Sequence, residues 1–333
     1  MRDWIEIGLD GAETGLGTAG FVSSTKIEAI QAAVESVIRG KSEVVRLALI
    51  GLFSGGHLLI EDVPGIGKTT LATALARALD LSIQRIQFTS DLLPSDVIGL
   101  SIFNPRSGDF EWRPGPLFAN IVLADEINRA TPKTQSALLE AMAEEQVTVD
   151  GISRPLQTPF MVIATQNPSE HHGTYPLPES QLDRFMLRLQ IGYPSFEDEK
   201  EILQDRLGSD PLDLLRPVLT RNEIIELQRR TAAVKVDDSL TDYLLRIVAA
   251  TRDSERLELG VSPRGALALF RSAQANALIS GREFCIADDI KHLVIPCFAH
   301  RVIVNSRSAG LRSHIREAEA ILSDILERVS VPL

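Results

Sequence analysis

The chain has 333 residues, of which 44% are hydrophobic and 24% are charged. These fractions are ordinary for globular proteins and exclude a disordered or fibrous protein, while the length favours two packed domains. The formal net charge of -11 disfavours non-specific binding to nucleic acid or to an anionic membrane surface.

The first part of the chain begins with a segment of low regularity. Residues 1–24 are rich in glycine and show neither a helical nor a strand period, so we interpret them as a flexible lead-in. From Lys26 apolar residues recur at helical spacing, and a second apolar helix is predicted over residues 42–53. Short apolar runs then alternate with helical patterns, which indicates a parallel sheet covered on both faces. The expected strands are residues 57–61, 85–88, 121–125, 160–166 and 186–191.

Two further segments have the pattern of a β-hairpin. Residues 100–103 and 110–112 flank a turn-forming stretch. Asp150 and Gly151, a preferred pair for a tight turn, lie within residues 146–155. The sequence therefore predicts two hairpin insertions in the first domain.

The pattern changes to helices alone after Pro194. The helices are expected over about residues 221–233, 240–253, 263–280, 287–298 and 311–329. We therefore predict an α/β domain with a parallel sheet over residues 25–193, followed by an all-helical domain over residues 194–333.

Residues 61–70 follow an expected strand and open an Ala- and Leu-rich helix. In that context backbone N–H groups of glycines curl around phosphate oxygens, a lysine reaches the β and γ phosphates, and a hydroxyl ligates Mg²⁺. The strict pattern has glycine six positions before the lysine, where this chain has Asp62. The segment predicts a P-loop in which Lys68 binds phosphate and Thr69 binds Mg²⁺. The neighbouring nucleotide-binding residues are Pro64, Gly65, Ile66, Gly67 and Thr70.

Polar residues also follow two later strands. The apolar run that starts at Ile121 ends in Asp125 and Glu126, at the sheet edge where it would meet the P-loop. We expect Asp125 to hold Mg²⁺ through water and Glu126 to orient and deprotonate the attacking water. Asn167 follows the strand expected at residues 160–166, where its amide would bond the γ-phosphate or the water. The alternative for Asn167 is a turn-forming role.

Together these motifs closely resemble the MoxR family of AAA+ ATPases over most of residues 25 to 300. The resemblance is carried by Glu61 to Thr70, Asn120 to Leu139, Ala164 to Phe185 and Val261 to Leu269. The two expected hairpins also match extra hairpins of the AAA+ branch that includes MoxR proteins, magnesium-chelatase ATPase subunits and MCM helicases. The resemblance implies an AAA+ P-loop αβα core and a helical lid, with ATP between them.

The resemblance also implies individual roles. It makes Lys68 and Thr69 Walker A residues, Asp125 and Glu126 Walker B residues, and Asn167 sensor 1.

Two arginines receive roles from the resemblance as well. Arg184 resembles the arginine finger that reaches into a neighbouring subunit's site, whereas taken alone it would be a surface ion-pair residue. Arg264, at the positive end of an expected helix, resembles sensor 2 of the lid, and its alternative is a solvated arginine. Val37 and Ile38 resemble the stretch that packs on adenine.

The wider function follows from the resemblance alone. It implies a hexameric ring that acts as a chaperone-like remodeller of client proteins, with a partner that carries a von Willebrand factor A domain, in maturation or metal-cofactor insertion. One alternative is a nucleic-acid motor, which the acidity of the chain and the few basic residues of the hairpins disfavour. Another is a nucleotide-dependent binding switch without turnover, which the presence of Glu126 together with Arg184 disfavours.

The remaining features predict a cytoplasmic protein. Cys285 and Cys297 lack the spacing of a zinc site or a disulfide framework, and no apolar run reaches the length of a membrane span. His171 and His172 are interpreted as solvated loop residues rather than metal ligands, because no third ligand is apparent.

Overall fold

The computed structural model describes residues 24–167, 173–205, 208, 210–305 and 311–332. The expected lead-in over residues 1–24 lies outside the described residues except for Ser24, and His171 and His172 lie outside them as well. None of the described helices is long and apolar enough to span a membrane.

A five-stranded parallel sheet forms the centre of the first domain, with the strand order β2-β5-β8-β1-β9. The strands are β1 (Leu58–Glu61), β2 (Ile83–Gln87), β5 (Ile121–Asp125), β8 (Met161–Gln166) and β9 (Leu187–Leu189). All five expected strands are confirmed within a few residues. The largest shift is in β2, an edge strand in which only Ile86 is buried and which therefore gives a weak apolar signal in the sequence.

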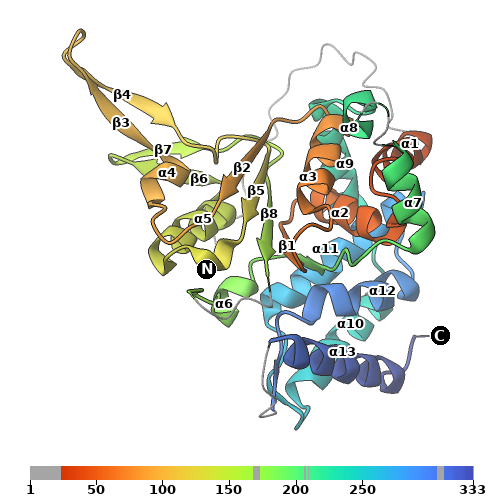
Figure 1. The fold of residues 1–333 in the computed structure, drawn as a ribbon. Helices are drawn as coiled ribbons and strands as arrows, with labels where there is room; N and C mark the ends of the chain where they lie inside the picture. Colours follow the sequence, from red (N-terminus) through yellow and green to blue (C-terminus); the bar gives the residue numbers. More distant parts are fainter. Residues whose placement is uncertain (1–23, 168–172, 206–207, 209, 306–310, 333) are drawn as a thin grey trace, which may run out of the picture.

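Both faces of the sheet are buried, which explains the continuous apolar runs of its inner strands. Leu58 and Ile60 pack in a core with α1 (Ser24–Glu35), α2 (Ser42–Phe53) and α3 (Lys68–Ala78). Leu59 points to the opposite face, which α5 (Pro132–Glu144) covers and beside which α4 (Pro94–Ile98) lies. These helices therefore form two layers around the sheet (Figure 1).

The two hairpins are confirmed and lie on the α5 side of the sheet (Figure 1). The first consists of β3 (Gly99–Asn104) and β4 (Asp109–Pro114), and the second of β6 (Gln146–Val149) and β7 (Ile152–Pro155). They contact each other, because the Ser101 hydroxyl donates to Asp150 at 2.5 Å and the Arg154 guanidinium lies 4.3 Å from the Trp112 ring centroid.

The C-terminal part is a helical lid, with one difference from the prediction of helices alone. Its helices are α9 (Arg221–Ala233), α10 (Asp238–Arg252), α11 (Pro263–Ile279), α12 (Ala287–Phe298) and α13 (Leu311–Arg328). A short antiparallel ladder joins β10 (Leu257–Leu259) to β11 (Ile303–Val304). These strands of three and two residues are too short to produce a strand period in the sequence, and they pair because Leu257 and Val304 are both buried.

The lid and the first domain share one hydrophobic core. Helices α9 and α11 contact α2, and α12 contacts β9. Two shorter helices, α7 (Phe196–Asp205) and α8 (Pro211–Leu214), connect the sheet to α9 and were not predicted. They lie beside α1 and α3 rather than among the lid helices (Figure 1). The domain boundary near Pro194 stays a prediction, because one continuous hydrophobic core joins the two parts of the chain.

A buried histidine ties three elements of the first domain together. The His57 ring precedes β1, with Nε2 3.1 Å from the Met142 carbonyl oxygen and Nδ1 accepting from the Val162 N–H at 3.0 Å. Because the carbonyl only accepts and the amide only donates, this geometry requires the neutral imidazole protonated at Nε2. Burial lowers the pKa of His57 from 6.5 to about 4.

We expect the free energy of unfolding to fall as the pH is lowered from 6.5 to 4. The unfolded chain takes up a proton on this imidazole in that window and the folded chain does not, a difference worth up to about 3 kcal/mol. His57→Gln keeps a donor for the Met142 carbonyl and should flatten the pH dependence measured by urea unfolding. Part of the slope should remain, because burial also lowers the pKa of His300. A slope identical to that of the wild type would contradict this account, and exposed His292→Gln is the control.

A buried ion pair links the sheet to the last helix. The Arg188 Nε lies 2.5 Å from a Glu61 carboxylate oxygen, and the two side chains are 4% and 3% exposed. Arg188 also bonds Glu319 of α13 at 2.9 Å. Removal of one partner leaves a charge buried without its main counter-ion, which is strongly destabilising.

Glu61→Ala should therefore lower the free energy of unfolding by about 3–5 kcal/mol in guanidinium denaturation. Arg256→Ala is the matched control. Arg256 pairs with Asp324 of α13, the helix that also carries Glu319, but both side chains of this pair are about half exposed. That change should cost about 1 kcal/mol or less. Equal losses in the two variants would show that burial does not govern the Glu61 pair.

Candidate functional site

The loop between β1 and α3 has the geometry of a phosphate cradle. Gly65 and Gly67 adopt positive φ angles of 82° and 97°, which glycine tolerates and other residues rarely adopt. Gly67 is the N-cap of α3 and no side chain caps this helix end, so its first N–H groups point toward a prospective anion. The Lys68 ammonium donates to the Asp62 carbonyl oxygen at 2.6 Å, which folds it back over the loop.

Asp62 explains the departure from the strict P-loop pattern. Its carboxylate accepts from the Val63 N–H at 2.8 Å and from the Gly192 N–H at 2.6 Å. A glycine could not make these bonds, because it has no side chain. The residue thus joins the start of the P-loop to the segment that leaves β9.

The ends of β5 and β8 bring the two acids next to a buried threonine. The Thr165 hydroxyl donates to Asp125 Oδ1 at 2.6 Å and accepts from the Glu126 N–H at 2.9 Å. Glu126 has a φ angle of 57°, an unusual conformation for a glutamate, and it caps the 3₁₀ helix η1 (Ile127–Arg129). Backbone strain at this position accords with a functional role.

Both carboxylates are held by side chains that the sequence did not identify. Arg85 donates to Asp125 Oδ2 at 2.6 Å and 3.2 Å, and it also donates to the Gln87 Oε1 at 3.0 Å. Gln87 and Arg129 in turn donate to Glu126 Oε2 at 2.7 Å and 2.9 Å. Arg85 and Gln87 are two residues apart on the edge strand β2, so they point to one face beside β5. The available signal was the presence of three polar residues, Gln84, Arg85 and Gln87, in a short strand that lies beside the strand of the two acids.

Asn167 lies directly after β8 and is 6% exposed. The preceding residue, Gln166, pairs with Glu61 at the end of β1, so Asn167 lies at the edge where the P-loop begins. The structure therefore brings the expected sensor 1 position to the same end of the sheet as Asp125 and Lys68.

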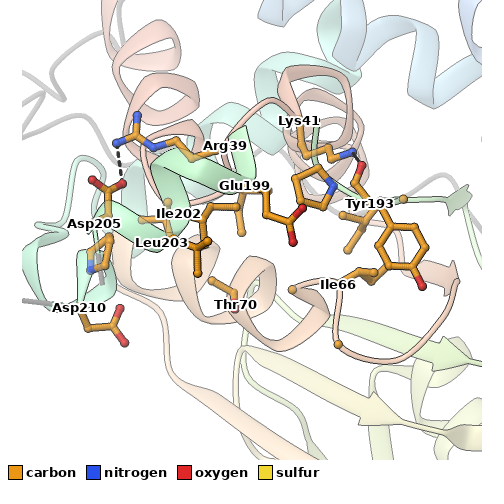
Figure 2. A pocket seen from close by; sticks show the side chains of 18 residues that line it. Arg39, Lys41, Ile66, Thr70, Tyr193, Glu199, Ile202, Leu203, Asp205 and Asp210 are labelled. Carbon is orange, nitrogen blue, oxygen red and sulfur yellow. Dashed lines mark hydrogen bonds and ion pairs between the residues drawn. The ribbon is translucent and has the colours of Figure 1, made fainter. Parts of the chain in front are cut away.

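A cavity of about 370 Å³ adjoins the P-loop (Figure 2). Six of the expected nucleotide-binding residues line it: Val37, Ile38, Gly65, Ile66, Gly67 and Thr70. Pro64, Lys68 and Thr69 are not lining residues and belong to the adjoining loop and helix start.

The opposite wall of this cavity comes from residues that sequence reasoning missed. Ile202 and Leu203 of α7 add apolar surface, and Tyr193 stands at the segment after β9 (Figure 2). Arg39 holds α7 through Asp205 at 3.0 Å. An apolar slot next to a phosphate cradle suits a purine base. The amphipathic pattern of residues 196–205 was the available signal.

Arg184 and Arg264 both line a second cavity of about 240 Å³. This cavity shares no lining residue with the first. Arg184 follows α6 (Glu179–Leu182), and its Nη1 donates to the Leu139 carbonyl oxygen. Arg264 is exposed in the first turn of α11. The P-loop cavity is lined by residues of both predicted domains, and only the expected contact of Arg264 with the nucleotide of its own copy is not met. The segment after β9, α7 and the start of α8 form the far wall of this cavity, and Arg264 of α11 is not among its lining residues.

Comparisons with known proteins agree with this geometry. The ATPase family associated with various cellular activities (AAA) matches residues 57–187, and the AAA lid domain matches residues 249–325. The protein YeaC of Bacillus subtilis is 49% identical over 302 residues, covering 90% of this chain and 93% of that protein. Chaperone MoxR1 of Mycobacterium tuberculosis is 40% identical over 308 residues, covering 90% and 80%. The crystal structure of a Cytophaga hutchinsonii protein assigned as an ATPase matches with a TM-score of 0.84 and 37% identity, covering 93% and 96%.

The contact of Arg85 with Asp125 generates a prediction about metal binding. A guanidinium that occupies Asp125 Oδ2 competes with any Mg²⁺ that approaches this carboxylate. Arg85 is half exposed, so the competition is worth about 1 kcal/mol, and Arg85→Ala should lower the Mg²⁺ concentration for half-saturation about fivefold. The measurement is a Mg²⁺ titration of fluorescent nucleotide binding. Arg113→Ala, on the first hairpin, is the control, and an unchanged or higher Mg²⁺ requirement for Arg85→Ala would contradict the competition.

Proposed function

The chain belongs to the MoxR family of AAA+ ATPases, and from that premise we propose that it hydrolyses ATP at sites shared between neighbouring copies in a ring. The observation that carries the proposal is the division of the expected site residues between two separate cavities. The P-loop and the Walker acids lie at one edge of the sheet, whereas Arg184 and Arg264 line the other cavity. An arginine finger supplied in trans acts on the nucleotide of another subunit, and we infer this role for Arg184 and Arg264.

Each residue then has a definite task. The P-loop N–H groups and Lys68 bind the β and γ phosphates, and the apolar wall with Ile38 holds the base. The Thr69 hydroxyl and the Asp125 carboxylate are hard oxygen donors at the correct edge and fit Mg²⁺, which would neutralise phosphate charge when bound. Glu126 takes the proton of the attacking water after its carboxylate leaves its present partners. Asn167 orients that water or the γ-phosphate.

The arginine of the neighbouring copy completes the site. Arg184 would place its guanidinium against charge that develops on the γ-phosphate, and Arg264 would add a second contact. The Arg184 Nε is buried and has no hydrogen-bond partner within the described residues, which is costly unless a ligand supplies one. Hydrolysis therefore depends on assembly. A ring of six copies follows from the family resemblance.

The work of the ring is proposed to be chaperone-like remodelling of client proteins. The relative from Mycobacterium tuberculosis is named a chaperone. The hairpins support contact with protein rather than DNA, because the first hairpin exposes Phe103 and Phe110, 51% and 72% exposed, in an edge-to-face pair. A partner with a von Willebrand factor A domain, metal-cofactor insertion and a cytoplasmic location rest on the resemblance and composition.

The test is the ATPase rate against protein concentration for the wild type, Arg184→Ala, and an equal mixture of Arg184→Ala with Lys68→Ala. Specific activity should rise with concentration, because the site forms between copies. Arg184→Ala should lose at least 100-fold in turnover, in line with the effect of arginine fingers. The mixture should regain activity, since a Lys68→Ala copy supplies its intact Arg184 to a neighbour with an intact P-loop.

Two controls sharpen this test. Glu126→Gln should bind nucleotide and lose turnover, and equal turnover would remove Glu126 as the base. Added DNA should leave the rate unchanged, whereas strong stimulation would favour the nucleic-acid motor. Activity that is independent of concentration, with Arg184→Ala fully active, would show that each copy hydrolyses ATP alone and would refute the shared site.

A further inference from the structure

The second cavity has an excess of positive charge that the two family arginines do not account for. Arg184, Arg264, Arg271 and Arg301 all line it, and Asp183 is the single carboxylate among its lining residues. Arg271 has no role in the P-loop cavity, of which it is not a lining residue. It lies on α11, two helical turns beyond Arg264.

The Asp183 carboxylate already has hydrogen-bond partners within the chain. Asp183 Oδ1 accepts from the Arg301 Nε at 2.9 Å, and Oδ2 accepts from the Ser262 hydroxyl at 2.9 Å. Arg301 is 1% exposed in its side chain and also bonds backbone carbonyls such as that of Met186. The Asp183–Arg301 pair is therefore a satisfied structural contact. It leaves the charges of the other three arginines without a counter-ion in the cavity.

The position of Arg271 is fixed by the fold. Residues 264 and 271 are about 10 Å apart along the axis of α11 and share one face of this 17-residue helix. The Arg271 carbonyl accepts from the Ser54 hydroxyl at 3.3 Å, which ties this turn of α11 to the end of α2. Leu267, between the two arginines, is 50% exposed. The helix thus presents a rigid face of two cations and one apolar side chain.

The two α11 side chains are available to a ligand. Within the described part of the chain, neither the Arg264 nor the Arg271 guanidinium makes a hydrogen bond or an ion pair, and both are exposed. Like charges on one cavity wall repel each other, and a polyanion would turn that repulsion into attraction. A cavity of about 240 Å³ has room for phosphate groups and lacks the apolar slot that a base requires.

We propose that this cavity receives the phosphates of ATP held in the P-loop of a neighbouring copy, and that Arg271 is a third arginine that contacts them beside Arg184 and Arg264. The inference rests on the proposed function and extends its site by one residue. A heterologous contact repeated around a ring places this face of one copy against the P-loop face of the next. The P-loop side supplies the polyanion and this side supplies the cations, so the two faces are complementary in charge. Leu267 would be buried in the same contact.

The test compares Arg271→Ala with the wild type and with Arg229→Ala. Arg229 is a matched control because it is an exposed lid arginine, 76% exposed in its side chain, and lies outside both cavities. Arg271→Ala should lower kcat at least tenfold. Its ring assembly, measured by sedimentation velocity in Mg·ATP, and its Tm should both equal those of the wild type. Arg271→Lys should restore part of the loss, because it returns the charge without the planar fork. Arg229→Ala should match the wild type.

Mixing separates a role in the neighbour's site from a role in the same copy. An equal mixture of Arg271→Ala with Lys68→Ala should regain turnover, since a Lys68→Ala copy offers an intact Arg271 to the neighbouring P-loop. An inactive mixture would overturn the inference, and so would dissociation of Arg271→Ala rings.

Failure of the inference and failure of the proposed function give different results. Wild-type turnover of Arg271→Ala beside an inactive Arg184→Ala would overturn the role of Arg271 and leave the shared site intact. Wild-type turnover of both variants would refute the shared site itself, and the inference with it.

Discussion

The parallel register of β5 and β8 is the constraint on which the catalytic edge depends. It places the buried hydroxyl of Thr165 between the Asp125 carboxylate, 2.6 Å away, and the Glu126 N–H, 2.9 Å away. One side chain therefore orients the expected metal ligand and holds the backbone of the expected base in its left-handed conformation. A register shift of one residue would turn Thr165 to the other face of the sheet and remove both contacts.

The same edge connects the acids to the first hairpin. Strand β2 holds Asp125 and Glu126 through Arg85 and Gln87, and its continuation bonds back to β5 through the Phe88 N–H. The chain then enters α4 and the first hairpin. If Asp125 or Glu126 exchanges Arg85 or Gln87 for another partner, β2 loses a contact, and β2 is the strand that leads to this hairpin. This is a physical route by which the state of the nucleotide could reach the surface proposed to contact a client.

Sequence reasoning predicted the parts of the site that are local in the chain. The P-loop and the pair Asp125 and Glu126 are contiguous motifs whose neighbouring strand signals are strong, and the sheet places them as expected. Contacts across the fold could not be predicted, because they depend on strand register and helix placement. Arg85 is such a case, since its role appears only when β2 is set beside β5. The apolar wall from α7 is another, and the ladder of β10 and β11 is too short for any sequence period.

The position of the lid relative to the P-loop could not be predicted from the sequence, and the proposed mechanism depends on it. Sequence motifs name Arg264 as a nucleotide contact, yet the packing of α9 and α11 on α2 sets this residue in a cavity apart from the P-loop. The start of the second predicted domain, in contrast, lines the P-loop cavity. Asp62 bonds Gly192, and Lys41 bonds the Tyr193 carbonyl oxygen at 2.8 Å, both beside the base cavity. In the proposed ring, a copy would contact its own nucleotide through Tyr193 and α7 and its neighbour's through the arginine face of α11. This separation allows the two signals to differ, which a ring needs if its copies are to hydrolyse ATP in turn.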